Sequence, residues 1–258
     1  MNIKAAFLAI GVALATANAC AVGSVADLSV FDRSENRVLP VYFHEGRYYV
    51  AGKPGNEYQL TLRNAQPGEI MAVVAVDGVN AVSGETADWA QTGYVLSAGA
   101  RYSIKGWRKS LQQVARFYFT ELDDSYAARS GRPDNVGVIG VAIFRSKREE
   151  PVGAIGEPLR SRDRAESRGA AEASGSSVDL SNRQPAAPAI EKSLGTGHGA
   201  HENAPVQTTR FERAGPVPDE VITIYYDSDR NLLASGVIRA PSIARPLAFP
   251  GRFVPDPR

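Results

Sequence analysis

Two histidines and a carboxylate that could bind a metal ion lie together in a Gly-rich segment, GTGHGAHE over residues 195–202. His198 and His201 are three residues apart, and Glu202 follows directly. Zinc accepts imidazole and carboxylate ligands, but a structural site needs rigid geometry and a full set of ligands. The sequence offers no third rigid ligand. We therefore interpret the segment as a loop that hydrogen-bonds to the domain surface, with zinc binding as the alternative.

Residues for catalysis form no convincing set. His44 is the only histidine in the region expected to fold, and no nucleophile-elbow motif accompanies it. Asp123 and Asp124 are adjacent carboxylates, whereas glycosidase chemistry depends on the spatial separation of two carboxyl groups. No Gly-rich phosphate loop opens a helix. We therefore expect no cofactor and no catalytic residue. The alternative is a hydrolase that uses carboxylates of the connection 123–135.

The segment DSDRN at 227–231 is similar to the start of a calcium loop. Such a loop needs Gly at its sixth position and a bidentate Glu at its twelfth. Leu232 and Ile238 occupy those positions, so we interpret the segment as a turn.

Aromatic, arginine and acidic side chains offer a further possibility, a binding surface. Tyr118 and Arg116 fall on the opposite strand face from Phe117 and are expected to point outward. Trp107 follows a glycine in a corner, where we interpret it as a core residue and keep a ligand platform as the alternative. The candidate binding residues are Trp107, Arg108, Arg116, Tyr118, Asp124 and Tyr126.

The elements that position these residues are predicted to be β-strands. The clearest is a hairpin over 69–84, EIMAVVAVDGVNAVSG, in which Asp77-Gly78 is typical of a type I′ turn. Both faces of its first strand are apolar, so we expect that strand to be covered on both sides.

Short alternating runs separated by turn signals recur from residue 25 to 147, which is the pattern of an all-β fold. We predict an antiparallel β-sandwich, with a jelly-roll-like or Ig-like strand order left open. The connection 123–135 is predicted to hold a helical turn, with Asp124 or Ser125 as N-cap and Gly131 at its end. The predicted strands are 38–44, 47–51, 57–63, 93–96, 101–104, 114–120 and a second central strand at 136–144.

The first 21 residues are predicted to be a signal peptide. Lys4 is followed by an apolar run over 5–15 and by overlapping A-x-A cleavage sites. Cys20 is the only cysteine, which excludes an internal disulfide. We expect a periplasmic or secreted product without a membrane span. A lipid anchor on Cys20 is the alternative.

Composition divides the rest of the chain. Between 148 and 217 the only aromatic residue is Phe211, and the segment is predicted to be a disordered linker. Runs at 221–226 and 232–238 predict a β-hairpin within 218–240, which must dock on the sandwich because an isolated hairpin is marginal. The Pro-rich tail 241–258 is expected to be extended.

Four segments are similar to a group of uncharacterised exported bacterial proteins: GYV (93–95), IKGWR (104–108), SYAARSG (125–131) and NVGVIGVAIF (135–144). GTGHG (195–199) and the run 221–238 are similar to the C-terminal part of that group. The resemblance implies that both ends of the chain belong to one architecture, and it assigns no residue a role.

The formal net charge is +1, with charges of both signs mixed, which argues against a nucleic-acid partner. We therefore expect an exported non-enzymatic protein that acts by binding or assembly, with an envelope protein or a glycan as partner. The alternatives are the hydrolase described above and a subunit of a surface or phage-like assembly.

Overall fold

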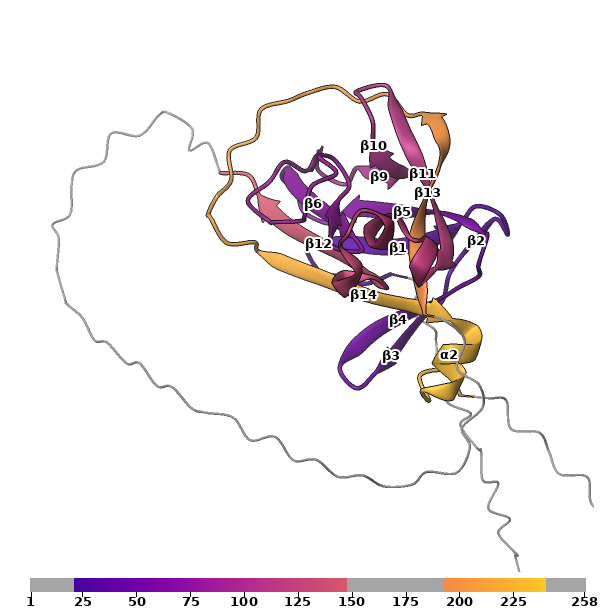
Figure 1. Ribbon diagram of the computed structural model, residues 1–258. Helices are drawn as coiled ribbons and strands as arrows, with labels where there is room; N and C mark the ends of the chain where they lie inside the picture. Colours follow the sequence, from indigo (N-terminus) through magenta and orange to yellow (C-terminus); the bar gives the residue numbers. More distant parts are fainter. Residues whose placement is uncertain (1–20, 148–192, 240–258) are drawn as a thin grey trace, which may run out of the picture.

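The structure, a computed structural model, describes residues 21–147 and 193–239 (Figure 1). Residues 1–20 of the predicted signal peptide, which include Cys20, residues 148–192 of the predicted linker 148–217, and the predicted tail 241–258 lie outside the described residues. Within those residues the strands form two seven-stranded sheets. Leu60 of one sheet and Val74 of the other belong to the same hydrophobic cluster, so the sheets pack face to face. The predicted all-β sandwich is confirmed.

The first sheet, sheet 1, has the order β10-β11-β5-β1-β2, with β13 paired to β11 and β9 to β5. All its strand pairs are antiparallel. Its strands are β1 Ala26–Asp32, β2 Arg37–Val38, β5 Glu57–Asn64, β9 Arg101–Ile104, β10 Gly106–Arg108, β11 Gln113–Glu121 and β13 Leu194–Asn203.

The second sheet, sheet 2, has the order β3-β4-β14-β12-β6-β7, with β8 paired to β6. Its strand pairs are antiparallel except that β14 runs parallel to β4. Its strands are β3 Val41–His44, β4 Arg47–Gly52, β6 Ile70–Val76, β7 Val79–Asn80, β8 Tyr94–Leu96, β12 Val138–Arg145 and β14 Glu220–Ser228. The helical elements are η1 Leu122–Asp124, α1 Tyr126–Arg129, η2 Pro133–Asn135 and α2 Asp229–Ala234.

The predicted central hairpin is confirmed as β6 and β7. Asp77 and Gly78 have φ values of 53° and 70°, the positive values that a type I′ turn requires at both positions. One face of β6 contributes to the main core. On its other face Met71 and Val73 join a smaller cluster, against which Phe211 packs. This second cluster explains why both faces of β6 are apolar.

The predicted helical turn is also confirmed. The Ser125 side chain accepts a hydrogen bond from the Ala128 backbone N–H at 3.2 Å, as an N-cap of α1 does. Gly131 follows α1 with a φ of 77°, a conformation that glycine adopts at little cost.

The predicted linker is wrong over its C-terminal part, because Leu194–Asn203 forms β13 and pairs with β11. The glycines of this strand permit close packing. A Cβ on Gly195 would lie 2.5 Å from the Ser125 Cβ, and a Cβ on Gly197 would lie 2.1 Å from the Tyr118 ring. A Gly-rich composition here marks close approach of neighbouring groups instead of chain freedom.

The predicted C-terminal hairpin is wrong as well. Glu220–Ser228 forms β14, but Asp229–Ala234 forms α2, so no strand returns over 232–238. The Ser228 side chain accepts a hydrogen bond from the Asn231 backbone N–H and caps this helix. The expected docking on the sandwich does occur, because β14 is an interior strand between β12 and β4.

Candidate functional site

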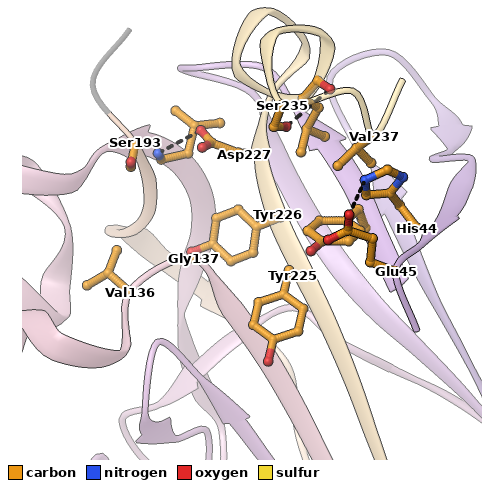
Figure 2. Close-up of a pocket in the computed structure, with 13 residues that line it drawn as sticks. His44, Glu45, Val136, Gly137, Ser193, Tyr225, Tyr226, Asp227, Ser235 and Val237 are labelled. Carbon is orange, nitrogen blue, oxygen red and sulfur yellow. Dashed lines mark hydrogen bonds and ion pairs between the residues drawn. The ribbon is translucent and has the colours of Figure 1, made fainter. Parts of the chain in front are cut away.

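A groove of about 360 Å³ opens at one end of sheet 2. Its walls come from the β3–β4 hairpin, residues 136–137 before β12, the start of β13, the end of β14, and α2 with the segment after it. In Figure 1 the β3–β4 hairpin and α2 lie next to each other at the lower edge of the molecule. Figure 2 shows His44, Glu45 and Val237 on one side of the groove, Ser193 and Asp227 on the other, and two tyrosines between them.

Three half-buried tyrosines form a row across the neighbouring strands β3, β4 and β14, and we call them the tyrosine row: Tyr42, Tyr49 and Tyr225. Tyr42 is the register partner of Tyr49, and Tyr49 is the register partner of Tyr225. Register partners point to the same face of a sheet. The Tyr49 and Tyr225 rings lie 5.6 Å apart between centroids, and both line the groove.

A charged residue borders the tyrosine row. The guanidinium carbon of Arg47 lies 5.3 Å from the centroid of the Tyr225 ring, which is within the range of a cation–π contact. Across the hairpin tip, His44 Nε2 lies 3.7 Å from Glu45 Oε1. The end of the groove therefore combines aromatic faces with groups that donate and accept hydrogen bonds.

Asp227 holds one wall of the groove together. Its Oδ1 accepts hydrogen bonds from the Leu194 backbone N–H at 3.1 Å, the Ser228 backbone N–H at 2.7 Å and Asn231 Nδ2 at 3.0 Å. These donors belong to β13, β14 and α2. The carboxylate thus joins three elements, and its first role is structural.

Behind the groove lies a buried carboxylate, Asp77. The Tyr226 hydroxyl donates to Asp77 Oδ1 over 2.5 Å, and the Gly137 backbone N–H donates to the same oxygen over 3.0 Å. The Thr196 backbone N–H donates to Asp77 Oδ2 over 2.7 Å. Tyr226 and Gly137 also line the groove, so the groove floor is attached directly to this carboxylate.

The hydrogen bonds continue into sheet 1 with a defined direction. Thr196 Oγ1 lies 2.7 Å from the Tyr226 hydroxyl and 2.6 Å from the Tyr58 hydroxyl. A hydroxyl carries one proton, and Tyr226 gives its proton to Asp77. Thr196 must then donate to Tyr226, and Tyr58 must donate to Thr196. We call this chain of Tyr58, Thr196, Tyr226 and Asp77 the buried network.

Burial raises the pKa of Asp77 to about 6, although the hydrogen bonds from Tyr226, Thr196 and Gly137 favour its charged form. A carboxyl group with a raised pKa is often catalytic. Asp77 has no exposed surface, however, and its carboxylate oxygens already accept protein donors. The network therefore fixes the groove floor and joins the two sheets; it presents no reactive group to a ligand.

The six candidate binding residues do not converge on one site. Trp107 is buried, as its interpretation as a core residue predicts, and its ring packs edge-on against Phe117 at 4.8 Å. The alternative, a ligand platform at Trp107, is wrong, because β10 turns this side chain toward the core. Tyr126 packs between Trp107 and His198. Asp124 is exposed at the end of η1.

Arg116 takes part in ion pairs on the outer face of sheet 1. It lies 2.8 Å from Glu57, which is also 3.7 Å from Arg33. Arg33 and Lys105 in turn bind Glu202, at 2.7 and 2.8 Å. Burial acts to raise the pKa of Glu202, but these two partners lower it overall. These side chains are thus already neutralised by neighbours.

The histidines of β13 lie together, and the described residues place no third metal ligand beside them. The His198 and His201 rings are 6.2 Å apart, and burial, followed by the charge of Lys109, lowers the pKa of His198. Glu202 makes the ion pairs described above instead of joining them. Within residues 21–147 and 193–239, no group of three or more His, Cys, Asp or Glu side chains has the spacing of a metal site.

Sequence reasoning missed the tyrosine row and the buried network. One signal for the network is present: Tyr58 and Tyr226 occupy core-facing positions in alternating strands, beside Leu60 and Ile224. A buried tyrosine hydroxyl needs a polar partner, which predicts a buried acceptor nearby.

Comparison with known proteins found no match: no family model, no curated protein and no solved structure matches the chain. Among the helices of the described segments, none has the length and apolar character needed to cross a membrane.

Proposed function

We propose that this chain is an exported, non-catalytic protein that binds a glycan of the cell envelope at the tyrosine row and the adjoining groove. The observation that carries the proposal is the alignment of Tyr42, Tyr49 and Tyr225 on one face of three neighbouring strands. Flat aromatic faces pack on the C–H faces of sugar rings, while the phenol hydroxyls remain available for hydrogen bonds.

The spacing of the tyrosines suits an extended ligand. Adjacent strands are about 4.8 Å apart, so three strands carry the row over a distance of about 10 Å. A row of this length underlies more than one sugar ring. The rings also sit on paired strands and not on a free loop, which limits the conformational entropy lost on binding.

The polar groups around the row suit the hydroxyls of a sugar. Glu45 provides an acceptor, Ser193 and Ser235 provide hydroxyl groups, and His44 donates or accepts according to its tautomer. A few placed polar groups beside apolar faces are the usual composition of a binding pocket.

Binding is better supported than hydrolysis. A glycosidase needs two carboxyl groups placed on either side of the scissile bond. Three acidic residues lie at the groove. Glu45 is exposed on the hairpin tip, but Asp227 opposite it is engaged in organising the wall, and Asp77 behind the floor has no exposed surface. Asp124 of the connection 123–135 does not line the groove. Export rests on the signal-peptide pattern of residues 1–21.

The test is co-sedimentation of the purified mature chain with peptidoglycan sacculi and titration with soluble chito-oligosaccharides. Tyr49→Ala and Tyr225→Ala are expected to weaken binding about ten-fold or more, as the loss of a central aromatic contact does. Phe43→Ala is the matched control, because Phe43 is an exposed aromatic residue adjacent to Tyr42 in β3 and thus on the other face of the hairpin.

Two results would overturn the proposal. One is a wild-type chain that is retained by none of these glycans. The other is binding that survives both tyrosine substitutions while the variants remain folded. Release of new reducing ends from the glycan would support the hydrolase alternative instead.

A further inference from the structure

A second cavity, of about 460 Å³, lies on the edge where the two sheets face each other. We call it the edge cavity. Sheet 2 contributes β8, sheet 1 contributes β9 and β10, and the segment 205–209 after β13 contributes a further wall. In Figure 1 the segment after β13 leaves the top of that strand and runs around to the start of β14. The volume falls within the range of about 300–1,000 Å³ that is typical of small-molecule sites.

The walls of the edge cavity continue the hydrophobic core. Val82, Tyr102 and Val206 line it and also pack against the main core cluster, to which Tyr94 belongs. The Tyr94 and Tyr102 rings, one from each sheet, lie 5.3 Å apart between centroids. Leu111 also lines the cavity and is 51% exposed. These walls fit an apolar ligand body.

Two polar atoms of the cavity residues have no hydrogen-bond partner. The Tyr94 hydroxyl and Arg108 Nε are both buried, and neither makes a hydrogen bond of good geometry with a described residue, although the two side chains lie close enough for Arg108 to act on the pKa of Tyr94. Tyr94 itself is only 8% exposed. Buried donors without partners are rare in native proteins because each loses its hydrogen bonds to water. Their presence in one cavity indicates a missing acceptor.

The charge of Arg108 is also unmatched. Its Nη1 donates to the Ala204 carbonyl at 2.7 Å and to the Ser110 carbonyl at 3.3 Å, and its Nη2 donates to the Tyr102 hydroxyl at 3.2 Å. All three acceptors are neutral, and no carboxylate of the described segments lies within 4.0 Å of this guanidinium. Burial raises the pKa of Tyr94 to about 12, although Arg108 acts to lower it. The phenol therefore keeps its proton at neutral pH and remains a donor.

We infer that the edge cavity binds a small organic acid, with an apolar body against Val82, Val206 and the Tyr102 ring and a carboxylate beside Arg108. The carboxylate supplies the charge that Arg108 lacks and an acceptor for the Tyr94 hydroxyl. Hydrogen bonds to charged groups are the stronger ones, so the acid is preferred over an uncharged molecule of the same shape. This site is separate from the tyrosine row, and the inference does not depend on glycan binding.

The segment that walls the cavity is anchored before and after residues 207–209. Before them, the Ala204 N–H donates to the Gln112 carbonyl at 2.8 Å, and the Val206 N–H donates to the Leu111 carbonyl at 2.9 Å. After them, the Lys147 N–H donates to the Glu212 carbonyl at 2.8 Å and the Ala214 N–H donates to the Arg145 carbonyl at 2.9 Å. Residues 207–209 themselves line the cavity and are exposed. A ligand can therefore reach the cavity from this side without breaking a strand pair.

Calorimetric titration of the full chain with 4-phenylbutyrate and with octanoate tests the inference, with 4-phenylbutanol as the uncharged match. Binding of either acid is expected, and the alcohol should bind about ten-fold more weakly than 4-phenylbutyrate. Tyr94→Phe should weaken binding of the acid about ten-fold without lowering the Tm, because the hydroxyl that it removes has no partner. Val206→Phe should abolish binding by filling the cavity.

Tyr225→Ala, in the tyrosine row, is the control and should bind the acids as the wild type does. The inference is overturned if neither acid binds, or if the alcohol binds as tightly as 4-phenylbutyrate. It is equally overturned if folded Tyr94→Phe and Val206→Phe proteins both bind the acids with wild-type affinity.

Discussion

Tyr226 and Asp77 are 149 residues apart in the sequence, and their side chains share a hydrogen bond of 2.5 Å in the core. This bond ties β14 to the turn of the central hairpin. The Thr196 N–H donates to the other oxygen of the same carboxylate, so β13 is tied to the turn as well. The strands β13 and β14 are therefore an integral part of the sandwich and not an appendage.

Tyr226→Phe is the first prediction. The substitution keeps the ring but leaves Asp77 and Thr196 each without one hydrogen-bond partner, so the free energy of unfolding should fall by about 1–3 kcal/mol. Tyr225→Phe is the matched control, because its hydroxyl has no place in the buried network, and it should change stability by less than about 0.5 kcal/mol. Urea denaturation of both variants gives the comparison, and equal values would contradict a stabilising role for the network.

The second prediction concerns pH. Asp77 has a folded-state pKa of about 6 against an ordinary value of 3.8, so the folded chain binds this proton more tightly than the unfolded chain does. Its ionisation therefore destabilises the fold above pH 6, and the penalty disappears as the pH falls from 6 to below 3.8. The difference between the two pKa values corresponds to about 3 kcal/mol.

Asp77→Asn isolates this contribution, because asparagine does not titrate. The stability of the wild type relative to the variant should increase by up to about 3 kcal/mol between pH 7 and pH 4. Both proteins are denatured at each pH, and the difference between their free energies of unfolding removes the contribution of all other titrating groups. A stability difference that stays constant with pH would show that Asp77 titrates as it does in the unfolded chain.

The sequence predicts the turn at Asp77-Gly78 but not the hydrogen bonds that its carboxylate accepts. Asp77-Gly78 is a local signal, since the turn type needs two adjacent residues with positive φ. The partners of the Asp77 carboxylate, Thr196 and Tyr226, lie more than a hundred residues away, beyond the reach of any local pattern. The tyrosine row depends in the same way on the parallel pairing of β4 with β14, which links two distant segments.

The Gly-rich composition of residues 195–202 led to the wrong prediction of a linker, because these glycines allow close packing of β13. The third prediction, Gly195→Ala, tests this point in β13. The new Cβ would lie 2.5 Å from the Ser125 Cβ and 2.7 Å from Val136 Cγ1, so we expect a loss of about 1–3 kcal/mol from overpacking. Gly215→Ala is the control, because nothing lies within 4 Å of the corresponding Cβ. If the two variants unfold at the same urea concentration, β13 does not pack against α1 as described.

A second carboxylate fixes the start of the chain's first long strand. Glu220, at the beginning of β14, accepts hydrogen bonds from the Ser24 N–H at 2.7 Å, the Ser24 hydroxyl at 2.8 Å and the Val25 N–H at 2.8 Å, with the Ala26 N–H at 3.3 Å. Burial acts to raise the pKa of Glu220, but these donors outweigh it and lower the pKa below 4.5. The carboxylate thus joins the start of β1 in sheet 1 to sheet 2.

Glu220→Gln should lower the free energy of unfolding by about 1–2 kcal/mol at pH 7, because the amide replaces one acceptor oxygen by a donor. The folded-state pKa of Glu220 is lowered, so its contribution is present above pH 4.5 and is lost as the pH falls through the folded-state value. The effect of the substitution should therefore shrink in acid, opposite in sign to the trend at Asp77. Glu69→Gln, at an exposed carboxylate with one long hydrogen bond, is the control. Hydrogen exchange should be faster at the Val25 and Ala26 amides of the Glu220 variant alone, and unchanged exchange there would mean that Glu220 does not hold this segment.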